Sequence, residues 1–332
     1  MKRFLSKILA FGLPLWILGV IYCVTDVFKV IHHYDSYYND SYYIDINRSY
    51  GSTMTYVNQN PKYDYNSFIF GNSRSIFYEV ETWKKYLPNE SRCMHFDESG
   101  GSICGIRDKI VFIDNNGGCI NNALMVIDHS LLSNLEYKDG WYVISPPVLK
   151  HYTNLFNFHL QHFMAFLNIR FLVAIVGYRL TEEFSPYMKG YVNMNPPSFI
   201  DKYNELRFSF AEKEIADGTY YDLERIRVFE NVQNPGTYSN EKIGKKGQQL
   251  LKDIKQVFDK HHTSYKIVIS PLYDQVKLNR DTYKILCQIF GKDKIYDFSG
   301  VNKWNKDFHN YYEASHYRPH VAAEVMKIVY SN

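Results

Sequence analysis

The chain has 332 residues, enough for one large domain or for one domain with an insertion. Apolar residues make up 45% of it and charged residues 22%, which excludes an intrinsically disordered chain. The net charge of +3 is too close to neutral to indicate nucleic acid as the main partner. The 30 tyrosines fit two interpretations, surfaces that stack on sugars and ordinary core or interface packing.

The N-terminus carries a long apolar segment. A run without charged residues extends from Ile8 to Thr25, about long enough to cross a bilayer once its flanks are counted. Lysine and arginine precede the run and Asp26 follows it, so the positive-inside rule places the N-terminus in the cytoplasm. No small-x-small cleavage site follows, which favours an uncleaved anchor over a signal peptide. We therefore expect a single-pass membrane protein, with residues 1–26 as cytoplasmic tip and transmembrane anchor and an extracytoplasmic domain.

The segment after the anchor has a different composition. Residues 27–60 are rich in Tyr, Asp, Asn and Ser and show little apolar periodicity, so we expect a spacer between the membrane and the domain. An alternation of strands and helices begins after it. The continuous apolar run at residues 123–127 is typical of a central strand in a parallel sheet. Strands are predicted at residues 68–70, 93–96 and 123–127, and a helix at residues 102–115.

The middle of the chain, residues 146–239, interrupts this alternation. It opens with an aromatic helical stretch whose most apolar part, residues 164–178, contains Asn168 and Arg170. The apolar runs on either side of these two residues are too short to cross a membrane, so we expect a buried or groove-lining helix. We interpret the region as an insertion or lid.

The alternation resumes near residue 240. Helices are predicted at residues 241–261, at 281–290 and from Pro319 onward, and strands at 266–270 and 294–298. Pro319 suits the first turn of a helix. Alternating strands and helices predict a parallel sheet with helices on both faces. The expected fold class is α/β, a three-layer parallel sheet formed by residues 61–145 and 240–332, with a helical insertion and an N-terminal transmembrane helix.

Two short motifs near the ends of this domain carry candidate chemistry. The sequence Gly-Asn-Ser-Arg, residues 71–74, follows the first predicted strand, and ligands of parallel sheets bind beyond the carboxyl ends of the strands. Ser73 then lies at the start of the next helix, where backbone N–H groups can bind an oxyanion. A serine nucleophile needs a base, and Glu313 and His316 are spaced so that the carboxylate can orient the imidazole. Each motif also fits a plain structural role, as helix cap, packing histidine or surface carboxylate.

The two motifs together resemble the SGNH (GDSL-like) hydrolase superfamily, and more closely its membrane-anchored branch, which includes proteins of D-alanyl transfer and of alginate acetylation. The resemblance covers roughly residues 65–130 and 240–330. It implies a flavodoxin-like fold, with Ser73 as nucleophile and His316 as base. Glu313 stands where the family usually has aspartate, which makes its role as the acid the weaker part of the resemblance.

The resemblance also implies an oxyanion site. Gly101 resembles the oxyanion glycine, with Gly100 as a close rival. Asn72 replaces the usual aspartate before the serine, and Arg74 either binds a phosphate or carboxylate of the substrate or pairs with an acid. The family's Gly-x-Asn block is missing, because residues 270–274 hold no asparagine at the corresponding strand end. One oxyanion donor is therefore unidentified.

Several other residues occupy the expected crevice. Asp128 and His129 form a second acid–histidine pair after the third strand, but adjacent side chains diverge, so we do not expect them to act together. Asp274 and Asp297 are expected to be turn residues, and Arg318 to stabilise local structure. No metal or cofactor site is expected, since the spacing of the cysteines matches no zinc pattern. Both disulfides and free buried thiols fit those cysteines.

Two functions follow. The first is a serine O-acyltransferase or esterase that acts through an acyl-serine on acyl groups of the cell envelope or of an exopolysaccharide. The second is a catalytically degenerate SGNH-like protein that binds polysaccharide or scaffolds envelope assembly. The expected partners are the membrane, a polysaccharide or other acylated envelope substrate, and envelope-assembly proteins.

Overall fold

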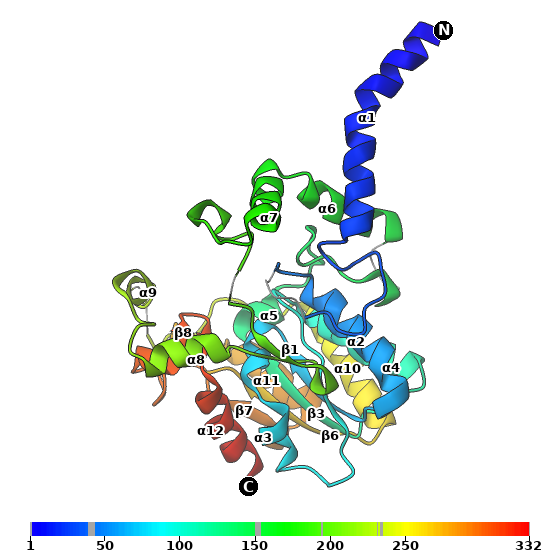
Figure 1. Ribbon diagram of the computed structural model, residues 1–332. Coiled ribbons are helices and arrows are strands. Elements are labelled where there is room, and N and C mark those ends of the chain that lie inside the picture. Colours follow the sequence, from blue (N-terminus) through cyan, green and yellow to red (C-terminus); the bar gives the residue numbers. More distant parts are fainter. Residues whose placement is uncertain are drawn as a thin grey trace.

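The computed structural model describes residues 2–38, 44–149, 154–193, 195–230, 232 and 235–331. A five-stranded parallel sheet lies at its centre, with the strand order β2-β1-β3-β6-β7 and helices on both faces (Figure 1). The strands are β1 (Ser67–Gly71), β2 (Cys93–His95), β3 (Asn122–Ile127), β6 (Ser264–Ile269) and β7 (Ile295–Asp297). The predicted α/β class and the predicted parallel sheet are confirmed.

The four helices predicted around the sheet fall close to their predicted ranges, and two small antiparallel pairs of strands lie outside the sheet. The α-helices are α1 (Lys2–Thr25), α2 (Arg48–Tyr63), α3 (Val80–Lys84), α4 (Ile103–Asn115), α5 (His129–Ser133), α6 (Leu155–Phe166), α7 (Ile169–Thr181), α8 (Ser209–Ala216), α9 (Leu223–Arg227), α10 (Lys245–Lys260), α11 (Arg280–Phe290) and α12 (Pro319–Tyr330). The small pairs are β4 (Ser198–Ile200) with β5 (Glu205–Arg207), and β8 (Tyr311–Glu313) with β9 (His316–Tyr317).

Two apolar cores lie on the two faces of the sheet, because successive side chains of a strand point to opposite faces. Phe68 and Phe70 of β1 enter the core that α4, α10 and α11 cover, whereas Ile69 enters the core that α3 and α12 cover. All five residues of β1 are buried. Burial on both faces explains why the central strands read as continuous apolar runs rather than alternating ones.

The order of the strands determines where a ligand can bind. From β1 the chain runs outward to β2, then returns to β3 on the other side of β1 and continues to β6 and β7. The strand order therefore reverses between β1 and β3, and such a reversal opens a crevice at the carboxyl ends of the two strands. Ser73 follows β1 and Asp128 follows β3, so both residues lie at this crevice.

The predicted spacer is wrong for residues 48–60, which belong to α2 (residues 48–63) and pack on the domain. The Asn47 side chain caps this helix by accepting a hydrogen bond from the Tyr50 N–H. Arg48 is buried and forms an ion pair with buried Asp97, with 2.7 Å between Nη2 and Oδ1. The buried face of α2 consists mainly of serine and threonine, so the sequence shows no apolar stripe where this helix is buried.

The N-terminal helix α1 extends away from the domain (Figure 1). Among the described residues, no single helix has the length and the apolar composition needed to cross a bilayer; α6 and α7 satisfy both only as a pair, which is bent by 68°. Gly12–Thr25 is a shorter apolar segment. The transmembrane anchor stays a prediction.

The insertion at residues 146–239 lies between β3 and β6, which are paired directly in the sheet. Helix α6 lies beside α1 and α7 packs against α6, whereas α8 and α9 lie near β8 at another part of the domain (Figure 1). The five cysteines are free thiols.

Buried His95 makes the stability of the fold depend on pH. Burial lowers the pKa of the His95 imidazole to about 4, so this side chain stays neutral in the folded state while the unfolded state takes up a proton below about pH 6.5. Stability is therefore lost as the pH falls from 6.5 towards 4. We expect this residue to lower the free energy of unfolding by about 2 kcal/mol between pH 7 and pH 5. Urea unfolding of the full chain at both pH values measures the change.

His95→Gln is the variant that tests this origin of the pH dependence, and His33→Gln, at an exposed position, is its control. The change in unfolding free energy between the two pH values should shrink in His95→Gln and stay unchanged in His33→Gln. Equal pH dependence in wild type and His95→Gln would show that other groups cause it.

Candidate active site

Ser73 is the first residue of a short 3-10 helix, η1 (Ser73–Phe77), that follows β1 after a sharp turn. Gly71 makes this turn possible. A Cβ atom on Gly71 would lie 2.6 Å from the Ser75 Cβ and 2.8 Å from the carbonyl oxygen of Val126, so only glycine lets η1 fold back this closely. The turn leaves Ser73 half-buried at the carboxyl end of the sheet.

His316 and Glu313 reach Ser73 from the hairpin of β8 and β9. The two residues lie directly opposite each other in this hairpin. The His316 Nε2 atom is 2.8 Å from the Ser73 Oγ, and the His316 Nδ1 atom is hydrogen-bonded to Glu313 Oε1. When Nδ1 donates to the carboxylate, Nε2 is free to accept the serine proton. The structure thus brings together three side chains that are separated by some 240 residues of sequence.

The environment of Glu313 keeps its carboxylate charged. Partial burial acts to raise its pKa, but the hydrogen bond and the charge of His316, together with hydrogen bonds from Ser315, outweigh burial and hold the pKa below its usual range. The Ser315 N–H donates to Glu313 Oε2 over 2.9 Å, so both carboxylate oxygens are held. A fixed, ionised carboxylate can orient the imidazole and stabilise the imidazolium that forms when His316 takes a proton.

Asn72 and Arg74 flank Ser73 but turn towards Asp128 at the end of β3. Asp128 Oδ2 accepts hydrogen bonds from Asn72 Nδ2 over 2.8 Å and from Arg74 Nη1 over 2.6 Å. Burial acts to raise the pKa of Asp128, but the Arg74 charge and hydrogen bonds from Ser130, Leu131 and Asn72 hold it below its usual range. Of the two roles considered for Arg74, the structure shows the ion pair.

Asp128 also belongs to the site, and the sequence alone did not predict this role. Its side chain joins the nucleophile turn to β3, whereas the neighbouring His129 turns away to Asp274, with 3.0 Å between His129 Nε2 and Asp274 Oδ2. The expected divergence of Asp128 and His129 is therefore observed. The available signal was an aspartate directly after a buried strand, but its partner could be found only once β1 and β3 were known to be neighbours.

Gly100 and Gly101 do not line the pocket that holds Ser73. They line a smaller pocket beside the buried carboxylate of Glu98, and a Cβ atom on Gly101 would overlap Glu98 Oε1 at 2.1 Å. The Ser102 N–H donates to the same oxygen over 2.9 Å. Ser99, immediately before this pair, is the residue of the loop that does line the Ser73 pocket.

The pocket around the three side chains has a volume of about 360 Å³. Its walls near Ser73 are mostly apolar and aromatic, and the insertion supplies a large part of them. The apolar and aromatic lining residues are Ile76, Phe77, Tyr142, Pro197, Leu206, Phe208, Ala211, Tyr220 and Tyr312. Arg318 fastens the insertion to the end of the β8–β9 hairpin through an ion pair with Glu212 of α8, with 2.5 Å between Nη2 and Oε2. Such a pocket suits the acyl portion of an ester.

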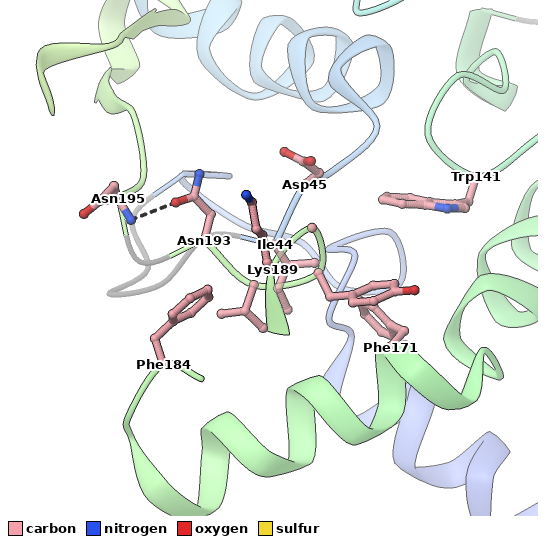
Figure 2. A pocket seen from close by; sticks show the side chains of 11 residues that line it. Ile44, Asp45, Trp141, Phe171, Phe184, Lys189, Asn193 and Asn195 are labelled. Carbon is pink, nitrogen blue, oxygen red and sulfur yellow. Dashed lines mark hydrogen bonds between the residues drawn. The ribbon is translucent and has the colours of Figure 1, made fainter. Parts of the chain in front are cut away.

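A second pocket, of about 380 Å³, adjoins the first and shares Asp45, Asn193 and Asn195 with its lining. Figure 2 shows Phe171 rising from α7 into this pocket, with Lys189 between it and the two asparagines. The Asn195 N–H donates to the Asn193 side chain over 2.9 Å (Figure 2). Apolar rings beside charged and amide groups suit a ligand that has both apolar and polar parts.

The hydrogen-bonded chain of carboxylate, imidazole and serine at the end of a parallel sheet defines a candidate site for serine-mediated acyl transfer. No family model matches the chain, and no curated protein matches it. In the part of the chain that the structure describes, no group of three or more His, Cys, Asp or Glu side chains is placed to hold a metal ion. A function for this chain must therefore be inferred from the geometry of the site.

Proposed function

We propose that the chain is an extracytoplasmic, membrane-anchored serine O-acyltransferase or esterase with an SGNH-like fold, acting on acyl groups of the cell envelope or of an exopolysaccharide. One observation carries the proposal: Ser73 Oγ lies 2.8 Å from His316 Nε2, and Glu313 holds the other nitrogen of the same imidazole. This is the arrangement that converts a weakly nucleophilic hydroxyl into an attacking group.

In the proposed reaction, Ser73 Oγ attacks the ester carbonyl carbon while His316 takes the hydroxyl proton. The tetrahedral intermediate collapses, the bond to the leaving oxygen breaks, and His316 returns the proton to that oxygen. The acyl-serine is then attacked by a polysaccharide hydroxyl or by water, whose proton passes to His316 and back to Ser73 Oγ. The Ser73 N–H, at the first position of η1, can donate to the oxyanion, because the first N–H groups of a helix have no intrahelical partner.

The fold supports an SGNH-like assignment. The strand order β2-β1-β3-β6-β7 follows the flavodoxin-like pattern, in which the chain reverses between the first and third strands. The nucleophile follows the first strand and the acid and histidine precede the last helix, as in the resemblance drawn from the sequence. Within this proposal α1 is the single membrane anchor, with the N-terminus in the cytoplasm.

A catalytically degenerate protein that binds polysaccharide or scaffolds envelope assembly is the second candidate. The oxyanion donors favour it: Asn72 is bonded to Asp128, Gly100 and Gly101 line another pocket, and residues 270–274 supply no asparagine. The two candidates differ in whether Ser73 reacts.

A fluorophosphonate probe distinguishes them, because it forms a covalent bond only with an activated serine. The full chain, purified in detergent, should gain one probe adduct, and peptide mapping should place it on Ser73. Glycan binding without any adduct would instead favour the degenerate protein.

Glu313→Gln should slow the reaction without abolishing it. A glutamine amide cannot stabilise the imidazolium, and by analogy with other catalytic triads the rate should fall by about 10²- to 10⁴-fold. Hydrolysis of an activated ester and the rate of fluorophosphonate labelling both measure this loss. Glu313→Asp keeps the negative charge and tests whether the length of the side chain matters. Glu324→Gln, on α12 and away from the site, is the control. A Glu313→Gln rate equal to that of wild type would remove the acid from the proposed mechanism.

A further inference from the structure

The hairpin of α6 and α7 is apolar on both of its faces. Its inner face packs Phe158, Phe166 and Phe171 into a core that also contains Tyr22 of α1. Its outer face is exposed and is also apolar, with Ile169 at 70% and Leu180 at 80% exposure. The exposed large apolar residues of the two helices are Leu155, Phe156, Leu160, Met164, Ile169, Val173, Val176 and Leu180. A helix that is apolar on all sides is normally covered on all sides.

Few polar groups interrupt this outer face. In α6 every exposed residue is apolar, and in α7 the exposed polar residues are Arg170, Arg179 and Thr181, which lie at the two ends of the helix. Basic side chains at the ends of an apolar helix can extend towards lipid headgroups while their stems stay in apolar surroundings. An apolar centre with polar ends suits a surface that contacts lipid acyl chains while its ends lie at the headgroups.

Helix α6 packs against the apolar surface of α1, beside the outer face of the hairpin. The ring of Tyr22 on α1 lies 5.3 Å from the rings of both Phe163 and Phe166 on α6. Phe163 also lines a groove with Leu15, Trp16, Val20 and Val24 of α1. Figure 1 shows α6 and α7 on the side of the domain from which α1 extends. The hairpin therefore lies where the proposed anchor would leave the bilayer.

The hairpin is too short to span the membrane and is held to the domain on its inner side. Helices α6 and α7 have 12 and 13 residues. At 1.5 Å per residue each is about 20 Å long or less, against a hydrocarbon core of about 30 Å. Together the two helices have the length and apolar composition of a membrane segment, yet they are bent by 68°. Such a bent pair fits insertion into one leaflet.

We propose that α6 and α7 form a membrane-docking hairpin, whose outer face is covered by lipid acyl chains of the outer leaflet and whose arginines lie at the headgroups. The inference rests on the membrane location in the proposed function, but not on its chemistry. Because Phe171 on the inner face of α7 lines the second pocket (Figure 2), docking holds that pocket about one helix diameter, some 10–12 Å, from the lipid surface.

Fluorescent probes at single cysteines test the docked position. In a Cys23→Ser, Cys119→Ser background, an environment-sensitive fluorophore is attached to Val176→Cys on α7, to Trp16→Cys on α1 or to Leu223→Cys on α9, which are all exposed positions. The full chain is reconstituted into vesicles of phosphatidylcholine and phosphatidylglycerol, with or without nitroxide groups on the acyl chains. We expect severalfold lower emission with nitroxide lipid at Val176→Cys and Trp16→Cys, and no change at Leu223→Cys.

The three probes separate failure of this inference from failure of the anchor. Quenching at Trp16→Cys but not at Val176→Cys would overturn the docking hairpin and leave the anchor intact. Quenching at Val176→Cys alone would support the hairpin and reject the anchor, and quenching at neither would reject both. The emission at Val176→Cys could instead shift to the blue without being quenched by nitroxide lipid. If that shift disappeared with one chain per nanodisc, a second copy of the chain would cover the outer face of the hairpin, and the proposal would be overturned.

Discussion

Ser73→Ala is expected to abolish covalent labelling by a fluorophosphonate and to lower ester turnover by about 10⁴- to 10⁶-fold, the loss typical when a triad serine is removed. The physical reason is that no other hydroxyl reaches the His316 Nε2 atom, which lies 2.8 Å from the Ser73 Oγ, within the part of the chain that the structure describes. Steady-state turnover of an activated ester and intact-mass detection of the adduct measure both effects.

Ser75→Ala is the matched control. Ser75 lies two residues further along the same turn and also has a histidine partner, with 3.2 Å between its Oγ and the Nε2 of His95. It is completely buried, however, and its hydroxyl is bonded to the carbonyl of Asn72. Ser75→Ala should lose stability but keep the label. If labelling persisted in Ser73→Ala and disappeared in Ser75→Ala, the reactive serine would be Ser75, and the assignment to Ser73 would be wrong.

The second large effect concerns stability and the buried ion pair between Arg48 and Asp97. Both side chains are almost inaccessible to solvent, at 2% and 0% exposure. The Arg48 guanidinium also donates to the Asn204 carbonyl, so it joins α2, the loop after β2 and the insertion. Arg48→Met leaves a buried carboxylate without its partner. We expect the free energy of unfolding to fall by about 3–5 kcal/mol, as measured by urea denaturation.

Two further variants separate the cost of an unpaired charge from that of lost packing. Arg92→Met breaks the exposed ion pair with Asp64 and should cost no more than about 1 kcal/mol, because solvent screens that pair. The double variant Arg48→Met, Asp97→Leu removes both buried charges and should recover part of the loss. A double variant that is less stable than Arg48→Met would show that the polar contacts of Asp97, not its unpaired charge, dominate.

Local sequence patterns were sufficient to predict the strands of the sheet and most of the helices that cover it. The apolar runs at residues 68–70, 123–127 and 266–270 became β1, β3 and β6, because strands buried on both faces consist of continuous apolar residues. The helices at residues 102–115 and 281–290 were predicted to within two residues of their ends, since an apolar stripe with helical spacing depends on a single core-facing side.

Helix α2 escaped prediction for the opposite reason. The face that it buries carries serine, threonine and Arg48, whose polar groups are bonded within the domain. A polar residue can be buried when its partners come from elsewhere in the chain, and those partners cannot be read from the helix itself. The same limit applies to Asp128, whose partners Asn72 and Arg74 lie some 55 residues earlier.

The sequence by itself determined the α/β alternation, the position of Ser73 after the first strand, and the pairing of Glu313 with His316. These features depend on short-range spacing, which a local pattern records. Only the tertiary structure decided that Ser73 meets His316, that Asp128 holds the nucleophile turn, and that Gly100 and Gly101 line a different pocket. Such contacts depend on the order of the strands and on the loops that pack above them, which bring together residues that no local pattern relates.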